Sequence, residues 1–253
     1  KPPAKIILKD HQMKQPHINC DSQDVQDLVI VCGDPARVMR IAALGSNPRH
    51  ISTNREFTVY ETTYNHHLIT ICSTGIGGVS ALIALEELIH CGAKSIIRVG
   101  SAGALQTELK LGDIIVVEGA VRHDGASAAY IEPAYPAIAD FSLSAKLSQY
   151  LANQQTRFAS GLIRSHDSFY TAQEQQICAH WSKIGLLGAD METSALLTLG
   201  RLRGIKVAAV LCTVVEYQAD LETSIAEYKD SDQLLIQSET NASSAALAAL
   251  TMS

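Results

Sequence analysis

Residues 95–104 have the sequence SIIRVGSAGA, an apolar run that is typical of a buried strand and that ends in a turn of small residues. Arg98 lies inside this run, where a guanidinium is costly unless an anion or a carboxylate pairs with it. One interpretation is an ion pair within the chain, with Asp113 or Glu86 as the partner. The other is an oxyanion bound beyond the end of the strand.

A second strand end shows the same combination of glycine and arginine. Residues 28–32 predict a buried strand, and the sequence GDPAR follows at 33–37. Guanidinium groups match the oxygens of phosphate in bidentate geometry. Gly33, Arg37 and Arg98 therefore predict one phosphate held between two strand ends.

Strand and helix patterns alternate along the rest of the chain. We expect strands at 28–32, 57–64, 68–72, 95–99, 113–117, 158–163 and 206–215, and helices at 37–44, 79–91, 142–152, 173–181, 191–202 and 233–249, with a loop at 123–139. Such alternation is typical of an α/β protein whose largely parallel sheet has helices on both faces. We expect residues 1–253 to form a single α/β domain with a mostly parallel, mixed central sheet, and residues 1–26 to be an N-terminal arm. Ligands of such folds bind beyond the carboxyl ends of the strands.

The composition argues against several classes of function. The formal net charge is −6 and no block of lysine and arginine occurs, so we expect no nucleic-acid partner. The six cysteines form no CxxC pair and no Cys/His cluster with zinc-ligand spacing, so we expect reduced, buried thiols and no metal. No apolar stretch approaches the ~20 residues that span a membrane, and the start of the chain lacks the apolar region of a signal peptide, so a cytoplasmic location is expected.

Two further segments have side chains or turns suited to a small ligand. Residues 73–78, STGIGG, lie between a predicted strand and a predicted helix, where a ligand or merely a tight turn explains the glycines. Met191 and Glu192 lie where another helix is expected to begin. Glu192 either favours the helix dipole, with Asp190 as the N-cap, or accepts two neighbouring hydroxyls, as a ribose requires.

Residues 167–175 place an aromatic side chain beside side-chain amides. Phe169 offers a face that could stack on a flat ring, and the amide of Gln173 could bind the edge of that ring. One core aromatic followed by a polar helix start explains the same pattern.

These segments, in this order, resemble the nucleoside phosphorylases of the uridine phosphorylase and hexameric purine nucleoside phosphorylase type. The similar motifs are PHIN at 16–19, GDPARV at 33–38, REF at 55–57, STGIGG at 73–78, IRVGSAGA at 97–104, VRHDGAS at 121–127 and PAIADF at 136–141. The resemblance extends to about residue 228 and is closest overall to uridine phosphorylase. The ordered occurrence of the motifs is far more specific than any one of them.

The resemblance implies a role for each matching residue. Phosphate would be bound by Gly33, Arg37, Arg98 and Ser101, and by Arg55 from a neighbouring subunit. Ribose would be bound by Met191 and Glu192, with His17 of a neighbour at the 5′-hydroxyl. The base would contact Phe169, Gln173 and Gln175, and the catalytic residues would be Arg98, Glu192 and Glu216.

The implied reaction is phosphorolysis of a nucleoside to a free base and ribose 1-phosphate. Its partners are the nucleoside and inorganic phosphate as co-substrate, with no metal and no organic cofactor. The implied assembly is a homohexamer built from dimers, with each site shared between subunits.

Two positions depart from the uridine phosphorylase pattern. Gln175 stands where those enzymes have the arginine of a Gln-x-Arg pair, and residues 212–217 look more like the purine enzymes, with Glu216 in place of their aspartate. A uridine-like substrate is the leading hypothesis, and a purine nucleoside with Glu216 as the acid is the alternative. Because Arg37, Arg55 and Arg98 are retained, a nucleosidase is less favoured. A non-catalytic nucleoside-binding protein, which the altered Gln175 position would allow, is the remaining, less favoured alternative.

Overall fold

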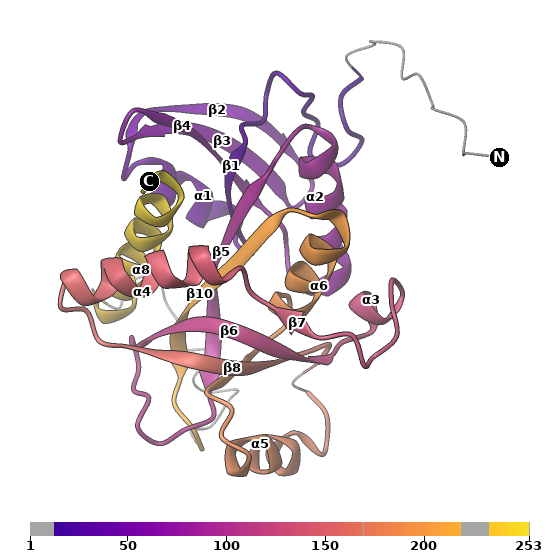
Figure 1. Ribbon diagram of the computed structural model, residues 1–253, viewed down its shortest axis with the longest axis vertical. Coiled ribbons are helices and arrows are strands. Elements are labelled where there is room, and N and C mark those ends of the chain that lie inside the picture. Colours follow the sequence, from indigo (N-terminus) through magenta and orange to yellow (C-terminus); the bar gives the residue numbers. More distant parts are fainter. Residues whose placement is uncertain (1–12, 169, 219–232, 253) are drawn as a thin grey trace.

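The two strands that carry the phosphate prediction lie side by side at the centre of one mixed sheet. The protein is described by a computed structural model over residues 13–168, 170–218 and 233–252 (Figure 1). Residues 1–12 of the expected N-terminal arm lie outside this range. The strands are β1 (Leu28–Cys32), β2 (Ser46–Asn54), β3 (Phe57–Tyr64), β4 (His67–Ser73), β5 (Ser95–Ala104), β6 (Ile114–His123), β7 (Ala137–Ile138), β8 (Phe158–His166), β9 (Gly188–Asp190) and β10 (Lys206–Val215).

Parallel pairing brings four carboxyl ends to one edge of the sheet. β1 pairs with β4 on one side and with β5 on the other, and β5 also pairs with β10. In this register Val31 lies opposite Arg98, so Gly33, which follows β1, adjoins the small residues that follow Gly100. These residues continue β5 to Ala104 and do not form the turn that the sequence predicted. This edge is where a ligand of an α/β fold is expected.

The sheet differs on its two sides. On one side β4, β3 and β2 are antiparallel neighbours. On the other, β10, β6, β8 and β9 lead back to β5, so that five strands form a closed ring of pairings. The expected α/β class with a mixed sheet is confirmed, and closure of this half is a feature that the sequence patterns did not predict.

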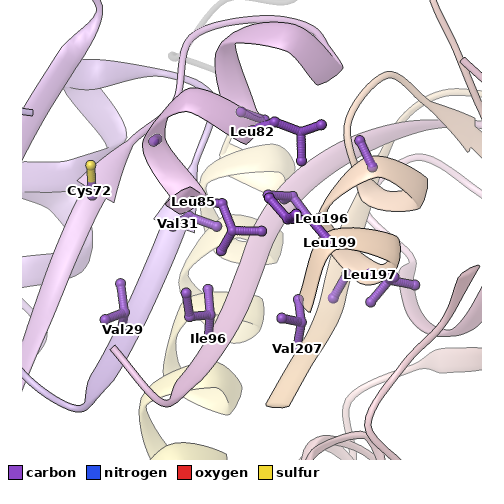
Figure 2. Packing of buried hydrophobic residues seen from close by; sticks show 14 of the residues in the cluster. Val29, Val31, Cys72, Leu82, Leu85, Ile96, Leu196, Leu197, Leu199 and Val207 are labelled. Carbon is purple, nitrogen blue, oxygen red and sulfur yellow. The ribbon is translucent and has the colours of Figure 1, made fainter. Parts of the chain in front are cut away.

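Helices cover both faces, as expected. They are α1 (Pro35–Ala42), α2 (Gly78–His90), α3 (Gly125–Ala128), α4 (Phe141–Asn153), α5 (Glu174–Lys183), α6 (Thr193–Arg203) and α8 (Gln233–Thr251). Alternate residues of each strand face opposite sides. Val29 and Ile96 pack with α2 and α6 on one face, as Figure 2 shows, and Ile30 and Ile97 pack with α1, α4 and α8 on the other. Each such buried side chain contributes about 1.5–3 kcal/mol.

Several elements were absent from the sequence expectations. β2 is an edge strand of mostly exposed polar residues, and β7 and β9 span only two and three residues, so no alternating apolar pattern marks them. The loop predicted at 123–139 contains α3 and β7. α6 begins at Thr193, two positions after the predicted start at Met191.

α5 is set apart from the two helical layers and has no buried residue (Figure 1). All six cysteines lie in the described residues as free thiols, and five are buried as predicted. Cys178 on α5 is the exception, since it is half-buried. Within residues 13–168, 170–218 and 233–252, no helix has the length and apolar character that crossing a membrane requires.

Candidate active site

The structure brings the phosphate residues that were predicted for the chain's own site to the same edge of the sheet. Arg37, in the first turn of α1, donates through Nη2 to Ser101 Oγ at 3.2 Å. Gly33 follows β1, and an added Cβ there would lie 3.3 Å from the carbonyl oxygen of Gly75. With Arg98, these side chains and the Gly33 backbone line a cavity of about 1720 Å³.

Arg98 is held by two carboxylates from the segment between β9 and α6. Its Nη2 donates to Glu192 Oε2 at 2.6 Å, and its Nε donates to Asp190 Oδ2 at 3.2 Å. The residue is 3% exposed. A buried guanidinium is tolerated because these carboxylates balance its charge.

Neither acid that the sequence suggested as an internal partner reaches Arg98. Asp113 pairs with Arg157 at 3.2 Å, and Glu86 pairs with Arg203 at 2.5 Å. The ion-pair interpretation was therefore correct about an internal partner and wrong about which acids supply it.

One nitrogen of Arg98 remains for a ligand. Nη1 is buried and has no hydrogen-bond partner among the residues that the structure describes. An unmet buried donor costs free energy, and an anionic oxygen in the cavity would satisfy it. Arg98 is thus suited to link a bound oxyanion to Glu192.

Glu192 is positioned by the glycine-rich turn as well as by Arg98. The Gly77 N–H donates to Glu192 Oε1 at 2.6 Å. Gly75 and Gly77 have φ values of 68° and 91°, which glycine adopts at little cost. The turn at 73–78 therefore does need its glycines, and it also directs a backbone donor at a side chain of the site.

Asp190 and Glu192, the two acids at the start of α6, have different roles. Asp190 accepts from the Thr193 N–H at 3.1 Å, whereas the Glu192 side chain makes no capping contact. Burial raises the pKa of Glu192, and the charge of Arg98 acts against that rise. Glu192 faces the cavity beside Met191, with a carboxylate that can accept hydroxyl groups.

The cavity collects most, but not all, of the predicted residues. It is lined by Gly33, Arg37, Arg98, Ser101, Gln175, Met191, Glu192 and Glu216. Gln173 is exposed and is not among its described lining residues, and Phe169 lies outside the described residues. The base-binding prediction is therefore supported by position for Gln175 alone.

Glu216 lies on the cavity wall just after β10. Its Oε1 accepts from the Leu111 N–H at 3.1 Å, and its Oε2 lies 3.5 Å from Lys110 Nζ. These contacts anchor the carboxylate to the loop that precedes β6.

Arg55 and His17, which were expected to serve a neighbouring subunit, lie away from the cavity of their own chain. Arg55 is exposed in the turn between β2 and β3, with φ of 55°. His17 lies with Nδ1 2.6 Å from Glu87 Oε1. Their roles in a partner's site stay predictions.

Cys178 is a potential nucleophile on the cavity wall, but its environment opposes reactivity. Burial, and then the charge of Glu174, raise the pKa of its thiol to about 11. Nucleophilic attack requires the thiolate. At neutral pH the side chain therefore acts as a packing group.

The family model described as "Phosphorylase superfamily" matches residues 27–251. The chain belongs to the phosphorylase superfamily. This confirms the resemblance to nucleoside phosphorylases that the motifs indicated.

The relatives of this chain differ in the nucleoside for which they are named. The chain is 36% identical to a guanosine phosphorylase of Halorubrum lacusprofundi over 79% of its own length and 83% of the relative. It is also 36% identical to a uridine phosphorylase of Treponema pallidum, over 78% of its own length and 81% of the relative.

Solved structures agree in fold over nearly the whole chain. A uridine phosphorylase from Vibrio fischeri superimposes with a TM-score of 0.89 and 50% identity, covering 96% of this chain and 99% of that one. A purine nucleoside phosphorylase from Toxoplasma gondii gives 0.84 and 30%, covering 95% and 96%.

Sequence patterns missed Glu239, which contacts Arg37, one of the arginines predicted to bind phosphate. Glu239 Oε2 accepts from Arg37 Nε at 2.7 Å, and its Oε1 accepts from Arg40 Nε at 2.6 Å. Glu239 is the single charged residue of α8, and that isolation was the available signal. Burial acts to raise the pKa of Glu239, but hydrogen bonds and charge from Arg40 and Arg37 outweigh it, so the pKa lies below its ordinary value.

Glu239→Gln is expected to raise the KM for phosphate about tenfold while the KM for nucleoside changes little, because Arg37 loses the charge that orients its guanidinium. Steady-state kinetics with each substrate varied in turn measures the two constants. Arg40→Gln is the matched control, since it breaks the contact of Glu239 with Arg40 and leaves the contact with Arg37. Equal rises in both KM values would contradict a positioning role.

Acid unfolding provides a second readout for the same variant. A carboxyl whose pKa is depressed by folding stabilises the protein above the unfolded-state pKa, and this contribution is lost as the pH falls through the folded-state pKa. Glu239→Gln is therefore expected to lower the free energy of unfolding by about 1–3 kcal/mol at neutral pH and to match the wild type at strongly acidic pH. A pH-independent difference would contradict the charge contribution.

Proposed function

We propose that this protein is a nucleoside phosphorylase that cleaves uridine or a uridine-like nucleoside with inorganic phosphate to a free base and ribose 1-phosphate. The observation that carries the proposal is the geometry of Arg98. One guanidinium nitrogen contacts Glu192 at 2.6 Å, and another is buried without a partner among the described residues that surround the cavity. A single side chain can thus join the phosphate to the residue that holds the ribose.

The chemistry needs groups of this kind. Breaking the glycosidic bond builds positive charge on the ribose and negative charge on the departing base. Phosphate held by Arg37 and Arg98, with the Gly33 backbone and Ser101, would stabilise the ribosyl cation and then bond to C1′ through one of its oxygens. Fixing the nucleophile in place is a large part of the rate enhancement.

The ribose would be held next to the phosphate, by the residues that adjoin Arg98. Glu192 would accept the 2′- and 3′-hydroxyls, while Met191 would pack against the sugar. Arg98 and Glu192 are in this sense the proposed catalytic pair. No metal or organic cofactor has a step in this scheme.

Uridine is favoured by the wider set of uridine phosphorylase motifs, and Phe169, Gln173 and Gln175 are the proposed base-side residues. A purine nucleoside is the second candidate, because Glu216 places a carboxylate on the cavity wall, where it could act as a general acid. The relatives named for guanosine and for purine nucleosides are consistent with this alternative.

We further propose a homohexamer, a trimer of dimers, in which His17 and Arg55 complete the site of a neighbour. Both residues lie outside the cavity of their own chain, which is the position such a role requires. The chain is proposed to act as one domain in nucleoside salvage in the cytoplasm, where its six free thiols would stay reduced.

The test is release of base from uridine, thymidine, inosine and adenosine, each with and without phosphate. Phosphate-dependent release of uracil is expected. Phosphate-dependent release of a purine base alone would assign the general acid to Glu216 and overturn the uridine assignment. Release without phosphate, or none from any nucleoside, would contradict phosphorolysis.

A further inference from the structure

A buried arginine that sequence patterns did not single out lies behind a residue of the cavity wall, Glu174. Arg164, near the end of β8, is 3% exposed. Its Nη1 donates to Glu174 Oε1 at 2.8 Å, and its Nε donates to His123 Nδ1 at 3.1 Å. Such a buried guanidinium needs a counter-charge, and Glu174 supplies it.

Glu174 is the first residue of α5 and lines the cavity. Arg164 is not a lining residue and lies behind Glu174. The Thr171 hydroxyl approaches its second oxygen, Oε2, at 3.5 Å. Burial acts to raise the pKa of Glu174, but the hydrogen bond and charge of Arg164 outweigh it, so that the pKa lies below its ordinary value. At neutral pH the cavity wall therefore presents a carboxylate here.

His166, which also lines this wall, contributes no positive charge. Its Nδ1 lies 2.9 Å from the carbonyl oxygen of Ser168, a contact that requires a proton on Nδ1. Burial, and then the charge of Arg164, lower the pKa of His166. Its Nε2, 4.0 Å from Glu174 Oε1, is then an acceptor-type nitrogen at neutral pH. Glu174 therefore carries the charge on this part of the wall.

We propose that Glu174, backed by Arg164, selects the base, and that it selects bases with a ring N–H beside a carbonyl over bases with a bare ring nitrogen at that position. The inference rests on the proposed function, because the cavity end that contains Glu174 is taken as the base end. Uracil, hypoxanthine and guanine carry such an N–H. Cytosine and adenine present a lone pair there instead.

The physical reason is the sign of the interaction at the ring edge. A carboxylate accepts the ring N–H in a charge-assisted hydrogen bond, whereas a ring lone pair would face the carboxylate across a desolvated contact. Sites built around one such hydrogen bond discriminate strongly against analogues that lack the donor.

The test compares kcat/KM for uridine against cytidine, and for inosine against adenosine, in the wild type and in Glu174→Gln. Glutamine keeps an oxygen for Arg164 and can turn its NH2 toward the cavity. The wild type is expected to have the higher kcat/KM for the member of each pair whose base carries the ring N–H. In Glu174→Gln, the ratio of the two kcat/KM values is expected to fall at least about tenfold in the pair that the enzyme cleaves faster.

Glu86→Gln is the matched control, because it removes the same charge from an ion pair with Arg203 outside the cavity. Its preference ratio is expected to equal that of the wild type. A purely structural role of the Arg164–Glu174 pair would lower kcat/KM for both members equally and leave the ratio unchanged. That result would overturn the inference.

Calorimetric titration of the wild type and of Glu174→Gln with uracil, cytosine, hypoxanthine and adenine separates this inference from the proposed function. Preferred binding of uracil over cytosine that depends on Glu174 would support the inference even if no nucleoside were cleaved. Phosphorolysis with a ratio unaffected by Glu174→Gln would leave the proposed function standing and reject the inference alone.

Discussion

Replacing Arg98 with alanine is expected to lower kcat/KM for phosphorolysis by at least about a thousandfold. The substitution removes the buried Nη1 that has no partner among the described residues, and it also removes the donor that holds Glu192 at 2.6 Å. Both the phosphate and the ribose contacts are therefore lost together. Initial rates over a range of phosphate concentrations measure the effect.

The same change leaves Asp190 and Glu192 buried without their shared cation, which is destabilising by about 3–5 kcal/mol. Arg98→Lys is the control for loss of activity through unfolding. Lysine keeps the positive charge but lacks the planar guanidinium that makes bidentate hydrogen bonds. We expect Arg98→Lys to fold, as judged by thermal unfolding, and to lose about a hundredfold with a raised KM for phosphate. Wild-type rates in either variant would contradict the assigned phosphate role.

Replacing Glu192 with alanine is expected to lower kcat/KM for a ribonucleoside about 100- to 1000-fold, and to lower it less for the matching 2′-deoxyribonucleoside. The carboxylate that would accept two hydroxyls is lost, whereas the deoxy substrate has one of those hydroxyls missing already. Uridine and 2′-deoxyuridine, assayed side by side, give the ratio.

The substrate pair also controls for indirect damage. Loss of Glu192 leaves the Gly77 N–H and Arg98 Nη2 without their present acceptor, which could weaken phosphate binding. That effect would lower both substrates by the same factor and raise the KM for phosphate. An unchanged ratio of uridine to 2′-deoxyuridine would therefore reject contact of Glu192 with the 2′-hydroxyl.

Local patterns predicted the central strands and the helices of both faces. β1 is an apolar run followed by Gly33, β5 begins with an apolar run followed by Gly100, and α2 has apolar residues at helical spacing. Each signal is therefore contained in its own segment. β2 was not predicted because an exposed edge strand needs no apolar face. β9 was not predicted because three residues are too few to show an alternating apolar pattern.

Among the site residues, the arginines and glycines could be found because a charge inside an apolar strand, or a glycine after one, is unusual in itself. Glu174 and Glu239 could not be assigned in this way. Nothing local shows that Arg164 contacts Glu174 or that Arg37 contacts Glu239. Gln173, by contrast, fitted the family pattern, yet it is not among the described residues that line the cavity.

The partner of Arg98 shows most clearly what folding adds. From the chain alone, Arg98 required an anion, because a guanidinium within a buried strand is unstable without one. Asp113 is nearer in sequence than Glu192, which is 94 residues away, and nothing local distinguishes one acid from the other. Glu192 reaches Arg98 because the short strand β9 pairs with β5 at Gly103 and Ala104 and so sets the start of α6 over the arginine. The contact between Glu192 and Arg98 thus depends on two pairs of residues in neighbouring strands. So short a pairing leaves no periodic pattern in the sequence.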